Sequence, residues 1–347
     1  MQESIIKKEI LEELRKEVKF RDPGIFEKAV YAFKLLDGVL KDYPDLIFKG
    51  GTSILLHIFP PIRFSIDVDI ILNPKDENLL EDNLKKVASE AGFNDVVEDI
   101  RKNEKGIPKN HFKFYYSSHY TRAKQYILLD IIFCRSPYSK LVKKSLSVCP
   151  LSLESSMEVK IPTIEGLFGD KLTAIAPNSL GISLNAKREM EFVKQVIDLG
   201  ALFEYLDNIE DIRKTFKDTV KLENIFRKTR YSIREVIENI LDVSFKYCQY
   251  LLKGANNTYK EIEHINSGLK RVSSHLISKY TQSDLKIAFS KIAYICRLLA
   301  TTQKKISKTV DYKLIEGKSL SDKYQLLEGL KKTNPQSYFY WIQAFGT

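Results

Sequence analysis

The strongest constraint on the fold of this chain is a pair of carboxylates at the head of an apolar segment. Asp67 and Asp69 lead directly into the apolar run 70–72, and they follow a short apolar segment at 46–48 and a Gly-Gly-Thr-Ser sequence at 50–53. Side chains at positions i and i+2 of a β-strand point to the same face of a sheet. We therefore expect the two carboxylates to project together, beside a turn whose backbone N–H groups and hydroxyls can hold phosphate.

A third carboxylate lies farther along the chain. Asp130 interrupts the segment 127–133, which is otherwise apolar and is typical of an interior strand. A buried carboxylate without a partner is strongly disfavoured, and three acids in one sheet would repel each other unless a cation neutralised them. Mg²⁺ solves this problem, because it takes oxygen ligands and keeps positions for water and phosphate. Two such ions could activate a hydroxyl and stabilise a departing pyrophosphate.

Each part of this pattern has a plainer interpretation when it is taken alone. Asp67 is then a turn residue, Asp69 opens a strand at the surface, and the two glycines form only a tight turn. A D-x-D pair by itself favours this interpretation, because the pattern is common. The order and spacing of the three parts, together with the apolar residues on both sides of Asp130, favour a functional site.

Composition and charge limit the classes of protein to consider. The chain has 55 Lys and Arg against 45 Asp and Glu, a net charge of +10, which suits a polyanionic partner such as nucleic acid. A charge spread over the surface for solubility is the alternative. The four cysteines form no CxxC pair, so we expect free thiols in a reducing cytoplasm. No apolar run is long enough to span a membrane, and the first residues lack the apolar core of a signal peptide.

The order of the predicted elements indicates an α+β fold in two domains. In the first part, strands are expected at 46–48, 67–72, 93–97, 111–116 and 126–133, with helices at 3–20, 25–40 and 77–91. From about residue 164 only helices are expected, at 165–176, 186–206, 209–216, 232–252, 284–299 and 319–330. We therefore predict a mixed-sheet domain with N-terminal and flanking helices over 1–160, and an all-helical domain over 161–347.

The turn and the acids together resemble the nucleotidyltransferase fold of the polymerase-β superfamily. In that fold a strand leads into a G-[GS] turn that opens a helix, D-x-D follows on the next strand, and a third acid stands on a later strand. More specifically, two segments look like the GGTxL and RFSxDID motifs of the AbiEii/AbiGii family, namely Lys49-Gly50-Gly51-Thr52-Ser53 and Arg63-Phe64-Ser65-Ile66-Asp67-Val68-Asp69. Members of that family are nucleotidyltransferase-like toxins of toxin–antitoxin and abortive-infection systems. Here Ile54 stands for the leucine and Val68 for the isoleucine.

Two downstream segments extend the resemblance, which covers roughly residues 45–205. Gly169-Asp170-Lys171-Leu172 resembles the family's helix with a DKL motif and an essential lysine. A later helix of the family carries an aspartate in an (R/K)D-x-x-D-L context, and here Lys194 and Asp198 match it. Gln195 stands where the first acid of that context is expected, which leaves the role of this helix open.

The resemblance implies a role for each matched residue. Asp67, Asp69 and Asp130 would form a site for Mg²⁺, with Mn²⁺ as an alternative, and Asp130 could instead accept the proton of the attacking hydroxyl. Lys171 would neutralise triphosphate charge, and Asp198 would orient Lys171 or the acceptor. Without the resemblance, Lys171 would be a solvated helix lysine and Asp198 a surface carboxylate. The rest of the nucleotide-binding set comes from the turn and from the segment before the acids, namely Gly50, Gly51, Thr52, Ser53, Arg63 and Ser65.

The activity that the resemblance implies is transfer of a nucleoside monophosphate from an NTP, with release of pyrophosphate. Catalysis would depend mainly on positioning and electrostatics. In related toxins the acceptor is RNA, at the 3′ end of tRNA, and a cognate antitoxin is the expected protein partner. The alternatives are a nucleotidyltransferase acting on a protein or a small molecule, a non-catalytic nucleotide- or RNA-binding relative, and a glycosyltransferase that uses D-x-D. The last alternative does not explain the Gly-Gly-Thr-Ser turn, and the intact acids argue against loss of catalysis.

Overall fold

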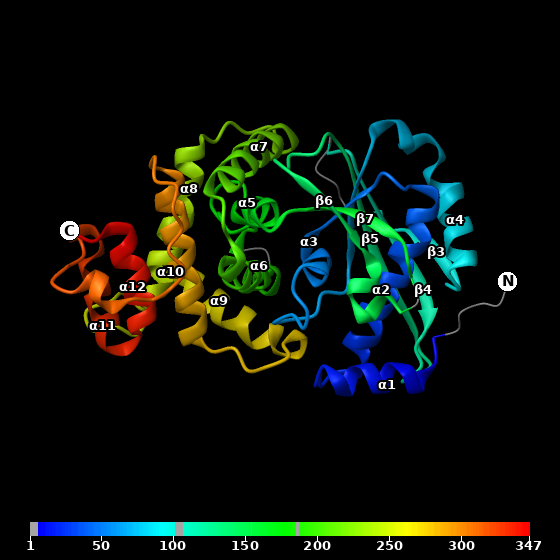
Figure 1. Ribbon diagram of the computed structural model, residues 1–347, viewed down its shortest axis with the longest axis horizontal. Helices are drawn as coiled ribbons and strands as arrows, with labels where there is room; N and C mark the ends of the chain where they lie inside the picture. Colours follow the sequence, from blue (N-terminus) through cyan, green and yellow to red (C-terminus); the bar gives the residue numbers. More distant parts are fainter. Residues whose placement is uncertain (1–5, 101–106, 154, 185–186) are drawn as a thin grey trace. The chain divides into compact units, whose positions relative to one another are not determined.

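The computed structural model describes residues 6–100, 107–153, 155–184 and 187–347. These residues form two compact units, which can be followed along the chain by colour in Figure 1. The sheet unit contains the described residues of 1–136, 140–163 and 274–278, and the helical unit contains those of 137–139, 164–273 and 279–347. The main division therefore falls between residues 163 and 164, and two short segments belong to the unit on the other side of it.

The sheet unit is built on a mixed sheet, as expected from the sequence. Within the described residues the sheet has seven strands in the order β3-β4-β5-β2-β1-β7-β6. Their bounds are β1 (Ile47–Lys49), β2 (Val68–Leu72), β3 (Asp95–Glu98), β4 (Lys109–Ser117), β5 (Lys124–Phe133), β6 (Leu141–Ser145) and β7 (Glu158–Pro162). β2 runs parallel to β5 and β1 runs parallel to β7, whereas the other neighbouring strands are antiparallel.

The strands β6 and β7 are absent from the prediction made from the sequence. Their sequences are Leu-Val-Lys-Lys-Ser and Glu-Val-Lys-Ile-Pro, and neither contains the continuous apolar run that identifies β2 and β5. β6 is the last strand of the sheet. Lysines are common on such edges because they discourage pairing with other chains. An edge strand of this kind gives little apolar signal.

Helices cover one face of the sheet. Helix α2 (Pro23–Asp42) packs against β2 and β5, and α4 (Leu80–Glu90) packs beside α2 (Figure 1). The side chain of Asp22 accepts a hydrogen bond from Ile25 N, which is the usual way to cap the first turn of a helix. Tyr31 of α2 stacks on Tyr116 of β4, with ring centroids 3.8 Å apart. The short helix α1 (Lys8–Glu17) precedes α2, and residues 3–5 of the predicted first helix lie outside the described residues.

The opposite face of the sheet carries the polar side chains. In β4, Phe112 and Phe114 are buried beneath α2, whereas His111, Lys113 and Tyr115 alternate with them and are only half-buried. β5 shows the same alternation in register with β4, except that Leu128 is buried on the polar face. Because successive side chains of a strand point to opposite faces, the charged side chains of both strands gather on the face away from α2.

The helical unit consists of α-helices with 3₁₀ segments and loops between them. Its α-helices are α5 (Ile164–Ala174), α6 (Glu189–Leu202), α7 (Ile209–Arg227), α8 (Ile233–Gln249), α9 (Lys260–Arg271), α10 (Gln282–Leu299), α11 (Leu330–Thr333) and α12 (Pro335–Phe345). α9 and α12 are absent from the prediction, and the start of the predicted helix 186–206 lies outside the described residues. No described helix is both long and apolar enough to cross a bilayer.

One predicted α-helix, 319–330, has a different structure. Asp322–Gly329 is a 3₁₀ segment, and α11 follows it. The buried side chains of Tyr324, Leu327 and Leu330 recur every third residue. This spacing matches the three residues per turn of a 3₁₀-helix rather than the 3.6 of an α-helix.

A short segment from late in the sequence completes the sheet unit. Phe64 N donates a hydrogen bond to His275 O at 2.8 Å, and Ile277 N donates to Ile62 O at 3.0 Å. The segment 274–278 is therefore hydrogen-bonded along the stretch that leads into Asp67 and Asp69. This pairing joins residues about two hundred positions apart, and no local sequence pattern predicts it.

Candidate active site

The two glycines of the turn allow it to lie directly against the acids. Gly50 has φ +76°, a left-handed conformation that glycine adopts without strain. A side chain at Gly50 would also collide with the Asp69 carboxylate. At Gly51 an added Cβ would lie 2.7 Å from Arg63 Nη2 and 2.8 Å from Ser65 Oγ. The structure thus brings the turn, the D-x-D segment and the stretch before it into contact.

The two hydroxyls of the turn brace it from within. Thr52 and Ser53 lie in the short helix α3 (Gly50–Ser53), and both residues are fully buried. Thr52 Oγ1 donates a hydrogen bond to the carbonyl oxygen of Asp67, and Ser53 Oγ donates to that of Gly50 at 3.0 Å. The Thr52 bond joins the turn to the residue before β2, and the Ser53 bond lies within the turn. The expected contact of these hydroxyls with phosphate stays a prediction.

Arg63 supports the same turn. Its side chain is almost fully buried, and Nη1 donates a hydrogen bond to Phe64 O at 3.3 Å. The guanidinium lies beside Gly51 together with the Ser65 hydroxyl. This geometry supports a role of Arg63 and Ser65 in fixing the turn, and their expected contact with phosphate stays a prediction.

Strand register aligns four ionisable side chains across the sheet. Lys49 of β1 is the cross-strand partner of Asp69, Asp69 is the partner of Asp130 on β5, and Asp130 is the partner of His111 on β4. Directly paired residues of neighbouring strands share a face, so these four side chains form one row, which we call the ionisable row. Asp67 lies two positions before Asp69 and is likewise half-buried. The structure therefore brings Asp69 and Asp130 together, although they are far apart in the sequence.

His111 belongs to this site but was not predicted as a site residue. His111 Nδ1 lies 2.7 Å from Asp130 Oδ1, and the two side chains are 12% and 27% exposed. With a proton on Nδ1 this contact is a hydrogen bond to the carboxylate, which fixes its orientation. The sequence favours a surface or satisfied polar role for each histidine. Only the register of β4 against β5 identifies this one.

The donor set near the turn fits a metal ion that binds together with phosphate. Among the described residues, no group of three or more His, Cys, Asp or Glu side chains is gathered closely enough to hold a metal ion by itself. Asp69 and Asp130 nevertheless offer two adjacent carboxylates. Mg²⁺ is usually held by one or two carboxylates plus substrate phosphates, and it keeps several waters. The metal role of Asp67, Asp69 and Asp130 stays a prediction.

The helical unit holds the other predicted catalytic residues as a buried pair. Lys171 of α5 lies 2.9 Å from Asp198 Oδ2 of α6, and the two side chains are 6% and 5% exposed. Gly169, two positions before Lys171, lets α5 approach α7 closely, since an added Cβ would lie 2.9 Å from Ile212 O. The structure therefore brings Lys171 and Asp198 together. This contact is what a role of Asp198 in orienting Lys171 requires.

Gln195 is part of this arrangement. Lys171 Nζ donates a hydrogen bond to Gln195 Oε1 at 2.8 Å. The pair of Lys171 and Asp198 has no net charge, and the neutral amide adds a hydrogen bond without adding a charge. An acid at position 195, which is half-buried, would add negative charge beside the buried pair, which is costly. Gln195 in place of the expected acid therefore adds no charge beside the pair of Lys171 and Asp198.

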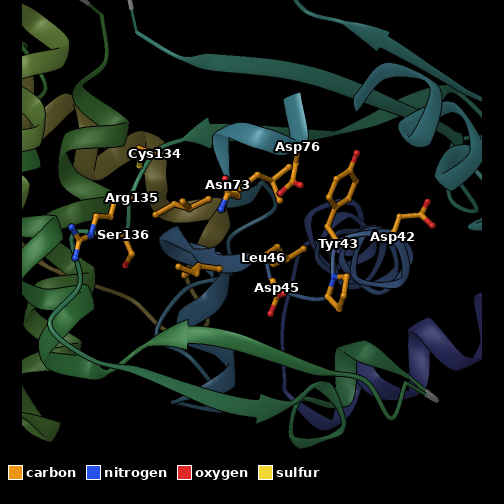
Figure 2. Close-up of a pocket in the computed structure, with 13 residues that line it drawn as sticks. Asp42, Tyr43, Asp45, Leu46, Asn73, Asp76, Cys134, Arg135 and Ser136 are labelled. Carbon is orange, nitrogen blue, oxygen red and sulfur yellow. The ribbon is translucent and has the colours of Figure 1, made fainter. Parts of the chain in front are cut away.

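A separate cavity in the sheet unit lies away from the ionisable row. It has a volume of about 370 Å³ and lies beside Leu72 and Asn73, at the opposite end of β2 from the acids. Figure 2 shows the carboxylates of Asp42, Asp45 and Asp76 around it. None of the predicted site residues lines this cavity. Cavity volume alone does not identify the site here.

Comparison with known proteins places these features in one family. A family model described as "Nucleotidyl transferase AbiEii toxin, Type IV TA system" matches residues 34–253. The match includes the turn, the three acids, Lys171 and Asp198. Solved structures similar to this chain include JHP933 from Helicobacter pylori, which is 16% identical with a TM-score of 0.45 over 79% of this chain and 92% of that chain. Another is an H. pylori protein provisionally described as a nucleotidyltransferase, 15% identical with a TM-score of 0.46 over 79% and 95%. No curated protein gives a significant match.

Proposed function

Because the chain belongs to the AbiEii family of nucleotidyltransferase toxins, we propose that this nucleotidyltransferase transfers a nucleoside monophosphate from an NTP to the 3′ end of an RNA, with tRNA as the acceptor. The observation that carries the proposal is the pairing of Asp69 with Asp130 on neighbouring strands, beside a turn whose Gly50 leaves room for the Asp69 carboxylate. Two adjacent carboxylates next to a tight backbone turn suit a triphosphate and its counterion.

The proposed reaction is an in-line displacement at the α-phosphorus. The acceptor hydroxyl oxygen forms a bond to the α-phosphorus, and the bond from that phosphorus to the oxygen bridging the α- and β-phosphates breaks. Pyrophosphate leaves with this oxygen, and the hydroxyl proton passes to Asp130 or to water. Asp67 and Asp69, with Asp130, would hold Mg²⁺ or Mn²⁺, which neutralises phosphate charge when bound. The remaining contribution of the protein is positioning.

The buried pair of the helical unit has a proposed part in nucleotide binding. Lys171 supplies a positive point charge for the triphosphate, and Asp198 and Gln195 hold its ammonium in a fixed position. Binding of the triphosphate would then exchange one anionic partner of Lys171 for another. A Lys171→Ala variant is expected to lose NTP affinity, and unchanged affinity would remove Lys171 from the site.

The biological role proposed here is that of a cytoplasmic toxin. Modification of the 3′ end of tRNA would stop translation, and a cognate antitoxin would neutralise the effect. Expression of the wild-type chain should then arrest growth, whereas Asp67→Ala should not. Equal growth of the two strains would contradict the toxin role and leave the transferase activity to be judged by itself.

The deciding experiment follows the two ends of the triphosphate separately. The protein is incubated with total tRNA, Mg²⁺ and each NTP in turn, labelled at either the α- or the γ-phosphate. The α-label should join the RNA with at least one NTP, and the γ-label should appear only in pyrophosphate. Asp69→Asn should abolish both, whereas Asp45→Asn, an exposed acid that pairs with Lys160, should change neither.

Other outcomes of the same experiment decide between the alternatives. An α-label that joins added protein or a small molecule, and never RNA, would establish a nucleotidyltransferase with a different acceptor. A folded protein that binds NTP and labels nothing would support a non-catalytic relative. Both outcomes contradict the proposed reaction.

A further inference from the structure

The face of the sheet that carries the acids also carries a pair of tyrosines. Tyr115 of β4 and Tyr126 of β5 are cross-strand partners, and their rings meet edge to face with centroids 5.9 Å apart. The register places both rings on the same face as Asp130 and His111. Tyr126 is 42% exposed, so its ring is accessible. Tyr126 lies four positions before Asp130, a distance of about 13 Å along the strand.

Lysine ammonium groups lie close to the Tyr126 ring. Nζ of Lys113 lies 5.3 Å from the ring centroid, and Nζ of Lys28 lies 5.5 Å from it. Lys113 also forms an ion pair with Asp99 at 3.0 Å. Lys28 comes from α2, where burial lowers the pKa of its ammonium and the Asp67 carboxylate opposes that effect. Lys28 belongs to the helix on the other face of the sheet, and Tyr126 precedes the part of β5 that pairs with β2.

The Tyr115 ring has a cation of its own. Nζ of Lys124 lies 3.9 Å from the centroid of this ring. Lys124 also approaches Asp95 at 3.6 Å, but both side chains are about half exposed, and such ion pairs contribute little. A cation within about 6 Å of a tyrosine ring is attracted by its π-face. Each ring therefore has a lysine ammonium within about 6 Å of its centroid.

The order of the strands gives the acceptor a direction of approach. The proposed function places the triphosphate at the turn beside Asp69, on the β1 side of the ionisable row. Asp130 lies on the next strand, on the side away from that turn. An acceptor hydroxyl that reacts beside Asp130 then has its preceding nucleotides on the β5–β4 side. Tyr126 and Tyr115 lie on that side.

We propose that Tyr115 and Tyr126 form a stacking platform for the last unpaired nucleotides of an RNA acceptor. On binding, a base takes the place of a lysine ammonium over a ring, and the released lysine contacts a phosphate. Proteins that bind single strands combine aromatic rings with basic residues in this way, and sheet faces supply such rings in RNA-binding modules. The platform rests on the proposed function, because that function supplies the reaction centre and its RNA acceptor.

A purely structural role for the same contacts makes a different prediction. Cross-strand aromatic pairs and lysine–tyrosine contacts stabilise antiparallel sheets without any ligand. Loss of a ring would then lower the thermal stability and leave the RNA affinity of the folded protein unchanged. The platform instead requires a loss of affinity, measured at a temperature where every variant is folded.

The test is the affinity for RNA, measured by fluorescence anisotropy. The probe is a labelled single-stranded RNA of about twelve nucleotides, within the site sizes of single-strand binders. Tyr126→Ala and Tyr115→Ala should each raise Kd about tenfold, the usual effect of losing one stacked base. Tyr126→Phe should bind like the wild type, because the ring rather than the hydroxyl stacks. Tyr312→Ala removes a tyrosine of the helical unit that is 52% exposed and should leave Kd unchanged.

Salt dependence gives a second readout for the lysines. Each phosphate contact with a single strand adds about 0.7 to the slope of log K against log salt concentration. Lys113→Gln and Lys124→Gln should each reduce the slope by about that amount. If the slope is unchanged in both variants, the proposal that these lysines leave the tyrosine rings and contact RNA phosphates is wrong.

The outcomes separate the platform from the proposed function. The platform is wrong if wild-type protein labels RNA and the two alanine variants keep the wild-type Kd. It is also wrong if the wild-type protein does not bind the RNA probe. The same holds if the two alanine variants keep their RNA affinity and lose only the binding of a protein partner. Conversely, RNA binding that depends on Tyr126, in a protein that transfers no nucleotide, would support the platform and contradict the proposed reaction. Affinity for NTP should be the same in all tyrosine variants.

Discussion

The two units present their charged site residues in opposite ways. In the sheet unit, Asp69 and Asp130 lie side by side on a half-buried face, and the Asp130 side chain is 27% exposed. In the helical unit, Lys171 and Asp198 are paired at 2.9 Å, with side chains only 6% and 5% exposed. The first arrangement keeps like charges together and accessible. The second has already neutralised its charges inside the protein.

This difference separates activity from stability. Neighbouring carboxylates repel each other, which offsets what each gains from its own neighbours, such as His111 beside Asp130. In a buried ion pair each partner compensates the other, and removal of one leaves an uncompensated charge. Substitutions of the ionisable row should therefore reduce transfer with little effect on folding, whereas substitutions of the buried pair should reduce both.

The largest expected effect on stability comes from removal of Asp198. Asp198→Ala leaves the Lys171 ammonium buried with the Gln195 amide, and the free energy of unfolding should fall by about 3–5 kcal/mol. Asp69→Asn removes one of two repelling, half-exposed carboxylates and should change it by less than about 0.5 kcal/mol. Urea unfolding of the two variants and the wild type measures both values.

The double variant Lys171→Met with Asp198→Leu provides the control. It removes both charges and replaces them with apolar groups, so it should recover much of the stability lost in Asp198→Ala. NTP binding should not return with it. Equal stability of Asp198→Ala and Asp69→Asn would contradict the distinction between the buried pair and the row.

The second prediction concerns the turn that lies against Asp69. Gly50→Ala should lower the free energy of unfolding by about 1–2 kcal/mol, because an L-residue is strained in the left-handed region. The added methyl group would also displace the Asp69 carboxylate, and we expect transfer to fall by about 10²–10³-fold, as when one contact to a transition state is lost. Unfolding curves and transfer rates test the two effects.

Gly317 offers a matched control for this substitution. It has φ +73°, and an added Cβ would meet nothing within 4 Å. Gly317→Ala therefore carries the same backbone strain without a collision, and it should lose stability but keep transfer. Equal transfer rates for the two alanine variants would show that Gly50 serves the fold alone.

These comparisons also show which parts of the molecule can be predicted from the sequence. β2 and β5 are recognised because each is a continuous apolar run, and an acid inside such a run is conspicuous. Lys171 and Asp198 are each identified by a short motif that resembles those of the family, which leaves open whether Asp198 orients Lys171 or the acceptor. Each of these signals lies within a short stretch of sequence.

The features that escape prediction depend on pairing between distant segments. His111 joins Asp130 only through the register of β4 against β5, and the segment 274–278 reaches Phe64 across most of the chain. Gln195 differs from the expected acid, and only the hydrogen bond from Lys171 explains its place. A single sequence contains no direct record of such contacts.

The smallest expected effect lies at the β4 end of the ionisable row. His111 contacts Asp130 and no predicted nucleotide-binding residue, so we expect it to position the carboxylate. His111→Leu should reduce kcat by about 10–100-fold, the usual effect of losing a group that orients a metal ligand. KM for NTP should change little, because the turn remains intact. In His111→Asn the amide Nδ2 can take the place of Nδ1 and donate to Asp130 Oδ1, so this variant should recover most of kcat.

The comparison between leucine and asparagine separates positioning from packing. Both substitutions remove the imidazole ring from a side chain that is 12% exposed, so a packing role predicts similar losses for both. A positioning role predicts recovery in asparagine alone, together with Mn²⁺ affinity that falls in His111→Leu and returns in His111→Asn. If the two variants have equal kcat and equal Mn²⁺ affinity, the hydrogen bond to Asp130 is not what the reaction uses. The ionisable row would then end at Asp130, and β4 would serve the acceptor side of the sheet alone.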